Sequence, residues 1–256
     1  MLRLATFNVN SVRRRVPHLR GFLERHAPDL VVLQETKCRT EEFPALEFAG
    51  TGYRVHASGQ AGGRNGVAVL GRIPFEVVAE ALPGDPEDTQ ARFLDIAAAG
   101  LRLAGIYLPN GNSGGEDGYA YKLRWMERLR GWITGRLDAF EPCAVLGDFN
   151  VCPTDADFAP GAMPLTDALV RPASRAAFRT MLHSGMTDAL RALHPGDAPY
   201  TYWDYGPAFE ANRGLRIDHI LLGPELAERL EGCGVDVVTR AEERPSDHAP
   251  VWCDLR

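Results

Sequence analysis

AVLGDFN, residues 144–150, is the stretch around which the fold and the function are organised. Its apolar run has the length and composition of a buried strand, and Gly147 marks the end of that strand. Asp148 and Asn150 are two residues apart, so their side chains point the same way in an extended segment. A carboxylate can take a proton from water while an amide holds that water in place. The same two residue types are also common in solvated turns, so the interpretation depends on whether the pattern recurs.

Polar residues do stand at the ends of other apolar runs. Strands are predicted at residues 2–7, 30–33, 67–70, 103–108, 144–146, 218–222 and 251–255. The polar residues at one end of these strands are Asn8, Asn10, Glu35, Tyr107, Asn110, Asp148, Asn150, Asp218, Asp247 and His248. Asp218, Asp247 and His248 precede their strands, and the other residues stand at or just after the ends of theirs. If the last two strands run antiparallel to the others, all of these residues lie along one edge of a sheet or sandwich.

Some of these side chains are suited to hold a metal ion. Glu35 and Asp247 offer carboxylate oxygens, and Asn8 and Asn10 offer amide oxygens. Hard oxygen donors of this kind suit Mg²⁺ or Mn²⁺ rather than zinc.

The other side chains are suited to hydrolysis of a phosphodiester. Asp148, helped by Asn150, can activate water. His248 can bind or polarise a phosphoryl oxygen, and Asp218 can hold its ring in one tautomer. Negative charge develops on the phosphate and the leaving oxygen in such a reaction, and this group of residues could stabilise it.

Composition is consistent with one α/β domain spanning residues 1–256. The chain is 45% hydrophobic, and it has no linker, repeat or apolar stretch of membrane-spanning length. The N-terminus runs straight into a strand, so no secretory signal is expected. The odd number of cysteines, 5, and the absence of a CxxC pair indicate reduced thiols in a cytoplasmic protein. The net charge of −6 argues against a generally basic nucleic-acid-binding surface, but it leaves room for a local basic patch.

The remaining patterns predict helices, one more strand and a loop. The helices are expected at residues 13–25, 119–136, 173–182 and 188–193, and the strand at 235–238. The glycine-rich residues 111–118 predict a flexible loop.

Two segments allow both a structural and a functional interpretation. Arg13, Arg14 and Arg15 stand at a predicted helix start, where the macrodipole favours acids. They form either a solvated face or a grip for phosphate. The aromatic residues 200–205 either pack into the core, which we favour for Trp203, or form a pocket wall for a base or sugar, which we favour for Tyr202.

Several motifs along the whole chain resemble the exonuclease III family of AP endonucleases, within the endonuclease/exonuclease/phosphatase superfamily that includes DNase I. The motifs are FNVNSVRRR (7–15), LQETK (33–37), NGVAVL (65–70), YLPNG (107–111), LGDFNV (146–151), NRGLRIDHILL (212–222) and PSDHAPVW (245–252). NRGLRID and NVCPTDAD (150–157) narrow the resemblance to exonuclease III. It implies a four-layer α/β sandwich in which helices flank two packed mixed sheets.

The resemblance also implies Mg²⁺-dependent hydrolysis of DNA, with Mn²⁺ as a possible substitute. The metal would be held by Glu35, with Asn10 and Asp247 nearby and Asn8 ordering the network. The catalytic residues implied are Tyr107, Asp148, Asn150, Asp218 and His248. Asp148 and Asn150 would prepare the water, and His248, oriented by Asp218, would contact the scissile phosphate beside Tyr107.

The substrate implied is double-stranded DNA with abasic sites or blocked 3′ ends. Similar proteins cut 5′ to an abasic site, and many remove 3′-phosphates and 3′-terminal nucleotides. The residues expected to contact DNA or line an abasic-sugar pocket are Arg13, Arg15, Asn110, Tyr202, Trp203, Leu215 and Ile217. One departure from the family is that residues 111–118 contain Glu116 and Asp117 but no Arg or Lys, which weakens the expected grip on DNA.

Two alternatives are weighed against this prediction. One is a phosphodiesterase of the same superfamily that acts on RNA, whose 2′-hydroxyl would occupy the sugar pocket. The other is a catalytically inactive nucleic-acid-binding regulatory protein, since a fold alone does not determine a function. An inactive protein is expected to lack some ligands, and every expected position is filled here. We expect a monomer.

Overall fold

Two mixed sheets form the centre of the protein. The computed structural model describes residues 1–196 and 199–256, and within them each sheet has six strands. The first sheet has the order β11 (Leu230–Val235), β12 (Val251–Leu255), β1 (Leu2–Asn8), β2 (Leu30–Gln34), β4 (Val67–Gly71) and β3 (Arg54–Ser58). The second has the order β5 (Phe75–Ala79), β6 (Phe93–Ala98), β7 (Leu101–Tyr107), β8 (Cys143–Asp148), β10 (Asp218–Leu222) and β9 (Thr187–Asp188).

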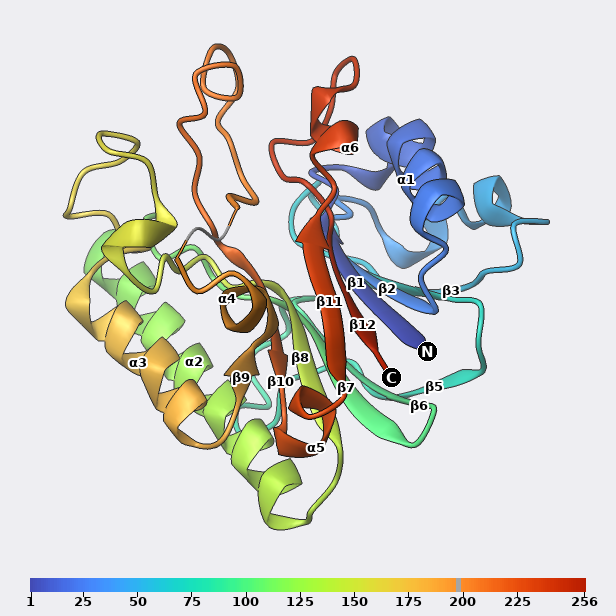
Figure 1. Cartoon of the computed structure of the whole chain (residues 1–256), viewed down its shortest axis with the longest axis horizontal. Helices are drawn as coiled ribbons and strands as arrows, with labels where there is room; N and C mark the ends of the chain where they lie inside the picture. The colour runs from blue at the N-terminus through green and yellow to red at the C-terminus, as the bar shows by residue number, and fades with distance from the viewer. Residues whose placement is uncertain (197–198) are drawn as a thin grey trace.

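Helices cover the outer faces of both sheets (Figure 1). The longer ones are α1 (Val12–His26), α2 (Gly115–Asp138) and α3 (Pro172–His183). The shorter ones are α4 (Ala189–Leu193), α5 (Pro224–Ala227) and α6 (Val237–Ala241), with 3-10 turns at Thr40–Glu42, Ala45–Phe48 and Asp155–Asp157. Apolar residues of α1 pack with those of β1 and β2, and apolar residues of α2 and α3 pack with those of β7 and β8. The predicted four-layer α/β sandwich is confirmed.

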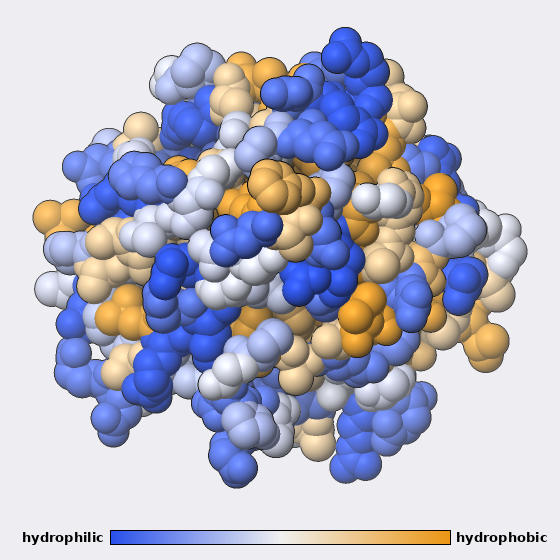
Figure 2. Space-filling view, turned by 90° about the horizontal axis from the view of Figure 1, so that it is seen from below, coloured by the Kyte–Doolittle hydropathy of each residue, from blue (hydrophilic) through white to orange (hydrophobic). Residues whose placement is uncertain are grey.

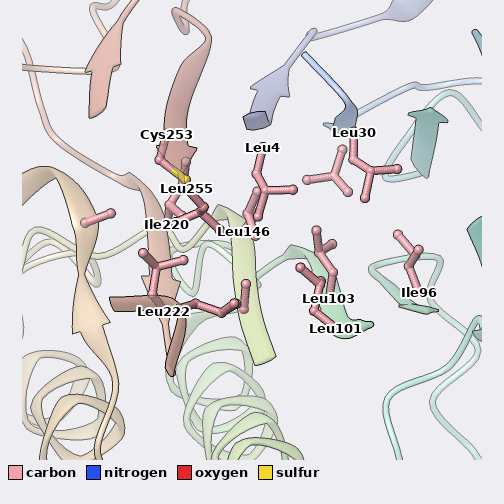
Figure 3. Packing of buried hydrophobic residues seen from close by; sticks show 14 of the residues in the cluster. Leu4, Leu30, Ile96, Leu101, Leu103, Leu146, Ile220, Leu222, Cys253 and Leu255 are labelled. Carbon is pink, nitrogen blue, oxygen red and sulfur yellow. The ribbon is translucent and has the colours of Figure 1, made fainter. Parts of the chain in front are cut away.

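The inner faces of the two sheets share one hydrophobic core. Leu4 and Leu30 from the first sheet meet Leu103, Leu146 and Ile220 from the second, and all five are buried (Figure 3). β2 is buried along its whole length, as its uninterrupted apolar run predicts. The core holds the two sheets face to face and so sets the distance between their polar ends.

Strand direction brings those polar ends to one edge. β1 runs parallel to β2, and β7 runs parallel to β8, whereas β10 is antiparallel to β8 and β12 is antiparallel to β1. The starts of β10 and β12 therefore meet the ends of the other strands, as expected. The register places Asp148 directly opposite Tyr107 on one side and Asp218 on the other.

Two predicted elements were wrong in part. The strand expected at 235–238 ends at Val235, and Val237–Ala241 is helical because the Asp236 side chain caps the helix by accepting from the Val238 amide. The helix expected from Tyr119 begins at Gly115, one turn earlier, so the predicted loop is shorter. Glu116 and Asp117 favour that first turn because carboxylates interact well with a helix N-terminus.

Some elements were missed. β3, β5 and β6 were not predicted, and two of them, β3 and β5, lie at sheet edges, where the apolar pattern is weak. The aromatic segment 200–205 forms no strand, and only Tyr202 makes isolated bridges there, with Leu215 and His248. The cysteines are all free thiols, as expected, and all are buried.

No helix in residues 1–196 and 199–256 is long and apolar enough to cross a lipid bilayer. Figure 2 shows the molecule from below the view of Figure 1. That surface is largely hydrophilic, and its hydrophobic residues are scattered in small groups.

The two sheets lie close together at a glycine of β7. A Cβ atom on Gly105 of β7 would lie 2.7 Å from Cγ1 of Val32 on β2. A methyl group at Gly105 would therefore force the two sheets, and the polar ends that they carry, apart.

We expect Gly105→Ala to lower the free energy of unfolding by about 1–3 kcal/mol through this overpacking. Gly131→Ala is the matched control, because no atom lies within 4 Å of the added Cβ on the exposed side of α2. The control should raise stability by about 0.5–1 kcal/mol, since alanine is the better helix former. Urea unfolding of both variants measures the difference, and equal effects would contradict the close sheet contact.

Candidate active site

One asparagine side chain joins the two sheets at the polar edge. The Asn8 Nδ2 atom, at the end of β1, donates to Glu35 Oε1 at 2.8 Å and to Asp148 Oδ2 at 3.0 Å. Glu35 follows β2 in the first sheet, and Asp148 ends β8 in the second. The Asn8 amide is fully buried, so its two donor bonds fix both carboxylates in the same place.

The backbone turns sharply where these strands end. Asn10, Glu35 and Asn150 have φ values of 41°, 51° and 48°. This left-handed region is unusual for glutamate and more common for asparagine. The backbone N–H of Ser11 holds the turn by donating to the Glu35 carbonyl at 2.8 Å. Surrounding hydrogen bonds keep the backbone in this strained conformation, which points the side chains into the site.

Asp148 is held by its neighbour Asn150. The Asn150 backbone N–H donates to Asp148 Oδ1 at 2.8 Å, and the Asn150 side chain is fixed by Asn110, which donates to Asn150 Oδ1 at 2.8 Å. Burial raises the pKa of the Asp148 carboxyl well above its usual range, against the opposing charge of His248, and Asp218 and Glu35 raise it further.

A buried lysine holds the backbone of Asn150 and Asn110 in place. Lys122 of α2 donates from Nζ to the carbonyl oxygens of Asn150 at 2.6 Å and Asn110 at 3.0 Å. Burial lowers the pKa of Lys122 to about 7, although nearby carboxylates raise it. The sequence predicted only a helix for this segment. The one sequence signal for this role is that Lys122 falls beside core positions in the helical pattern of the segment.

His248 and Asp218 form a second buried pair. His248 Nδ1 lies 2.8 Å from Asp218 Oδ2, and His248 Nε2 lies 3.8 Å from Asp148 Oδ2. Thr201 donates to the same Asp218 oxygen at 2.7 Å, a contact that sequence analysis missed. Burial lowers the pKa of His248, but Asp218 outweighs this and raises it to about 10. The imidazole therefore faces Asp148 as a cation.

A second lysine, Lys37, connects Glu35 to Asp247 through the side chain of Asn10. Lys37 Nζ lies 2.8 Å from Glu35 Oε2 and donates to Asn10 Oδ1 at 2.6 Å. Asn10 in turn donates from Nδ2 to Asp247 Oδ1 at 2.9 Å. Burial raises the pKa of Glu35, but Lys37 and the Asn8 hydrogen bond outweigh it, so the pKa lies below its usual value. Glu35 is therefore ionised.

The donor set fits a divalent metal ion. Ligand atoms of Glu35, Asp148 and His248 lie within 4.8 Å of one another. The carboxylates of Glu35, Asp148 and Asp247 are among those that line the same cavity, and their oxygens are hard donors. A bound cation would offset the repulsion that raises the pKa of Asp148.

The amides of Asn8 and Asn10 are both hydrogen-bonded within the site. Asn8 Oδ1 accepts the Asn10 backbone N–H at 3.0 Å, and Asn10 Oδ1 accepts Lys37 Nζ. Both amides turn their nitrogens toward carboxylates and so orient those carboxylates.

The site opens onto a cavity of about 360 Å³. Of the residues described above, those that line it are Glu35, Asn110, Asp148, Asn150, Asp247 and His248. The other residues of its lining are Tyr107, Asn112, Ala162, Met163, Asp167, Leu169, Tyr202, Asp204, Arg213, Leu215 and Ile217. Buried carboxylates therefore share a small cavity with several apolar side chains.

A family model for the endonuclease/exonuclease/phosphatase family matches residues 5–248. The chain belongs to that family. The resemblance to exonuclease III is confirmed by exodeoxyribonuclease III of Haemophilus influenzae, which is 32% identical over 268 residues and matches along 100% of both chains.

Two solved structures of family members are also similar. One is a variant of the 3′ phosphatase NExo from Neisseria bound to a product DNA hairpin, with a TM-score of 0.94, 36% identity and coverage of 100% of both chains. The other is an AP endonuclease from Archaeoglobus fulgidus, with a TM-score of 0.92, 36% identity and coverage of 100% of this chain and 99% of that one. The predicted class of enzyme, a hydrolytic nuclease, is confirmed by these matches.

The predicted pocket residues of this family member separate into two groups. Asn110, Tyr202, Leu215 and Ile217 line the cavity. Trp203 was expected there, but it is 3% exposed and packs behind the wall against Ala208, Phe209 and Ala249. The ring can be buried because its indole N–H donates a hydrogen bond to Asn212 Oδ1 at 3.2 Å.

The two predicted arginine contacts also differ from each other. Arg13 is exposed, and its Nη1 atom lies 3.8 Å from Glu42 Oε2, which places it outside the cavity. Arg15 is 3% exposed and donates from Nη2 to the Tyr205 hydroxyl at 3.1 Å. Successive helix positions point in different directions, so a run of arginines is divided between solvent and interior.

We expect Asp218→Asn to lower the pKa of His248 by about 1–3 pH units in the metal-free protein, because the anion that raises it is lost. Asp204→Asn is the control, since Asp204 lines the same cavity but has no hydrogen bond to His248. An NMR titration of the His248 ring measures both variants. An unchanged pKa in Asp218→Asn would show that another group charges the imidazole.

Proposed function

We propose that this chain is a divalent-metal-dependent DNA repair nuclease that hydrolyses phosphodiesters 5′ to abasic sites. We further propose that it removes 3′-phosphates, 3′-phosphodiesters and 3′-terminal nucleotides from duplex DNA. The observation that carries the proposal is the position of buried Asp148 beside His248, facing a small cavity with an apolar wall. The names of the relatives, an exodeoxyribonuclease III, a 3′ phosphatase and an AP endonuclease, support it.

Asp148 is the proposed general base. Its raised pKa favours acceptance of a proton from water, and its two oxygens are held by Asn8 and by the Asn150 backbone N–H. The Asn150 amide is fixed at the rim of the cavity by Asn110 and by the Leu108 carbonyl. Water placed there would be aligned for attack on a phosphorus atom in the cavity.

His248 and Tyr107 are the proposed stabilisers of developing charge. The Asp218 carboxylate keeps His248 cationic, which suits a phosphoryl oxygen. Burial, together with Glu35 and Asp148, raises the pKa of the Tyr107 phenol well above its usual value, so the phenol stays protonated. It can then donate a hydrogen bond to an anionic oxygen.

We propose that Glu35, Asp148 and Asp247 hold the metal, Mg²⁺ with Mn²⁺ as a substitute. When bound, such an ion supplies Lewis-acid stabilisation of phosphate charge. Asn8, Asn10 and Lys37 act on this set by orienting its carboxylates.

Substrate choice would follow from shape. Tyr202, Leu215 and Ile217 form an apolar wall that suits a deoxyribose without a base, and a normal nucleotide would need more space. This wall offers few hydrogen-bonding groups that could recognise a particular base. The protein would act as a cytoplasmic monomer on double-stranded DNA.

The two alternatives predict different results. An inactive binding protein would lack part of the catalytic set, and here His248 is hydrogen-bonded to Asp218 and lies 3.8 Å from Asp148. An RNA phosphodiesterase would cut an RNA strand faster than an abasic duplex.

We expect the wild-type chain to nick a duplex with one abasic analogue in Mg²⁺ but not in EDTA. Asp148→Asn should reduce the rate by about 10²–10⁴-fold, because the proton acceptor is lost. Asp138→Asn, which removes an exposed carboxylate at the end of α2, should have no effect.

Gel assays with abasic, undamaged, 3′-phosphate and RNA substrates measure these rates, and urea unfolding checks the fold. Near wild-type cleavage by Asp148→Asn would refute the role of Asp148. Binding of wild-type protein to the abasic duplex without metal-dependent nicking would instead favour a regulatory protein.

A further inference from the structure

Two of the sequence motifs, NVCPTDAD (150–157) and NRGLRID (212–218), lie against each other in the structure. Arg216 of the second motif joins them at two points. Its backbone N–H donates to the carbonyl of Asp157 at 2.7 Å, and its Nε atom donates to Asp157 Oδ1 at 2.7 Å. Arg216 and Asp157 do not line the active-site cavity, so the chemistry proposed above does not use them.

The Arg216 guanidinium stands at the centre of a buried group of charges. The side chain is 1% exposed, and its Nη1 atom donates to Asp188 Oδ2 at 2.6 Å. Arg191 donates to Asp157 as well, so two arginines balance two aspartates. Burial raises the pKa of Asp157 and of Asp188, but Arg216 outweighs it, and both pKa values lie below their usual range. Both carboxylates are therefore ionised.

His219 connects the same two motifs a second time. Its Nε2 atom lies 3.0 Å from the carbonyl oxygen of Val151, and its Nδ1 atom lies 3.0 Å from Arg216 Nη1. A carbonyl oxygen can only accept and a guanidinium can only donate, so the ring carries its proton on Nε2 and accepts through Nδ1. The group formed by Arg216, Asp157, Asp188, Arg191 and His219 is called the ion cluster below.

The ion cluster lies behind the apolar wall of the active-site cavity. Arg216 stands between Leu215 and Ile217, and both of these line the cavity whereas Arg216 does not. β10 begins at Asp218, and Leu215 makes isolated bridges outside any strand. The position of this part of the wall therefore depends on individual hydrogen bonds, and those of Arg216 are among them.

Stability alone does not account for charges in this place. Burial of ions removes their hydration, and apolar residues of similar volume often stabilise a core as well or better. An ion cluster differs from apolar packing because the guanidinium fork forms bonds of fixed direction and so sets the position of the groups that it joins. That property suits a wall whose distance from the reacting atoms decides which sugar fits.

We propose that Arg216 is a positioning residue that gives the cavity its selectivity for a deoxyribose without a base, a proposal that rests on the function proposed above. Through the ion cluster, it holds Leu215 and Ile217 at a distance from Asp148 that suits the smaller sugar. Arg216 itself touches neither the substrate nor the reacting atoms. A displacement of about 1 Å in such a support can cost about 10²-fold in rate.

Arg216→Lys is the test variant, and Arg102→Lys is its matched control. Lysine keeps the charge but has no fork, so it cannot reproduce the fixed bonds to Asp157 and Asp188. Arg102 also donates from two nitrogens to a buried carboxylate, that of Asp95, but it lies at the start of β7 and outside the cavity. Urea unfolding measures the stability that each variant loses. Asp157→Asn breaks the same cluster from the other side and replaces Arg216→Lys if that variant does not fold.

The selectivity is measured as a ratio of two rates. It is kcat/KM for nicking at an abasic analogue divided by kcat/KM for removal of a normal 3′-terminal nucleotide. We expect Arg216→Lys to lower this ratio on the order of tenfold, because the wall no longer holds the baseless sugar against Asp148. Arg102→Lys should leave it unchanged, since a loss of folded enzyme lowers both rates by the same factor. An unchanged ratio in Arg216→Lys and Asp157→Asn would overturn the proposal.

Methyl NMR examines the wall without the reaction. We expect the methyl signals of Leu215 and Ile217 to broaden by μs–ms exchange in Arg216→Lys, because a support of the wall is lost. The same signals should stay sharp in Arg102→Lys. Signals that are equally sharp in both variants would show that the ion cluster does not position the wall.

The two proposals fail separately. If the wild-type protein nicks abasic DNA and Arg216→Lys keeps the wild-type ratio, the positioning role is wrong and the nuclease proposal stands. If the wild-type protein cleaves none of the DNA substrates while the wall signals broaden in Arg216→Lys, the ion cluster does position the wall, and the proposed nuclease function is what fails.

Discussion

The whole site depends on one buried amide that bridges two sheets. Asn8 ends a strand of one sheet and donates to Glu35 on the same sheet and to Asp148 on the other. Both acceptors are carboxylates whose mutual repulsion would otherwise push them apart. The bridge works only because the shared core of Leu4, Leu103 and Leu146 holds the sheets at a constant separation. Packing in the centre of the sandwich is thus a condition for the chemistry at its edge.

The site concentrates negative charge and balances it with few cations. Lys37 lies against Glu35, and His248 lies between Asp148 and Asp218. The two carboxylates end up in different states: the pKa of Glu35 is below its usual value, and that of Asp148 is above it. A separation of pKa values like this one lets one acid of a neighbouring pair stay ionised while the other accepts a proton.

Positive charge is distributed in a complementary way around the site. The acidic centre lies between an apolar wall, formed by Tyr202, Leu215 and Ile217, and an arginine-lined cleft that contains Arg14. The net charge of −6 describes the whole surface and does not reveal this local arrangement. A protein can therefore be acidic overall and still carry a small basic cleft near its acidic centre.

The sequence by itself determined the elements whose signal is local. Apolar runs predicted β1, β2 and β8, helical patterns predicted α2 and α3, and the motifs at strand ends predicted which side chains gather at one edge. The edge strands β3 and β5 were not predicted, because few of their residues are fully buried and their apolar pattern is weak. The strand expected at 235–238 failed because an Asp236 cap outweighed the β-branched residues after it.

Tertiary structure alone decided how these side chains are used. Only the fold shows that Asn8 offers nitrogen rather than oxygen to the carboxylates, and that Thr201 and Lys122 support Asp218 and Asn150. The physical reason is that hydrogen-bond direction and burial depend on neighbours distant in sequence, whereas strand and helix patterns depend on neighbours close in sequence. Asn8 and Asp148 are 140 residues apart along the chain, and only packing of the two sheets brings them together.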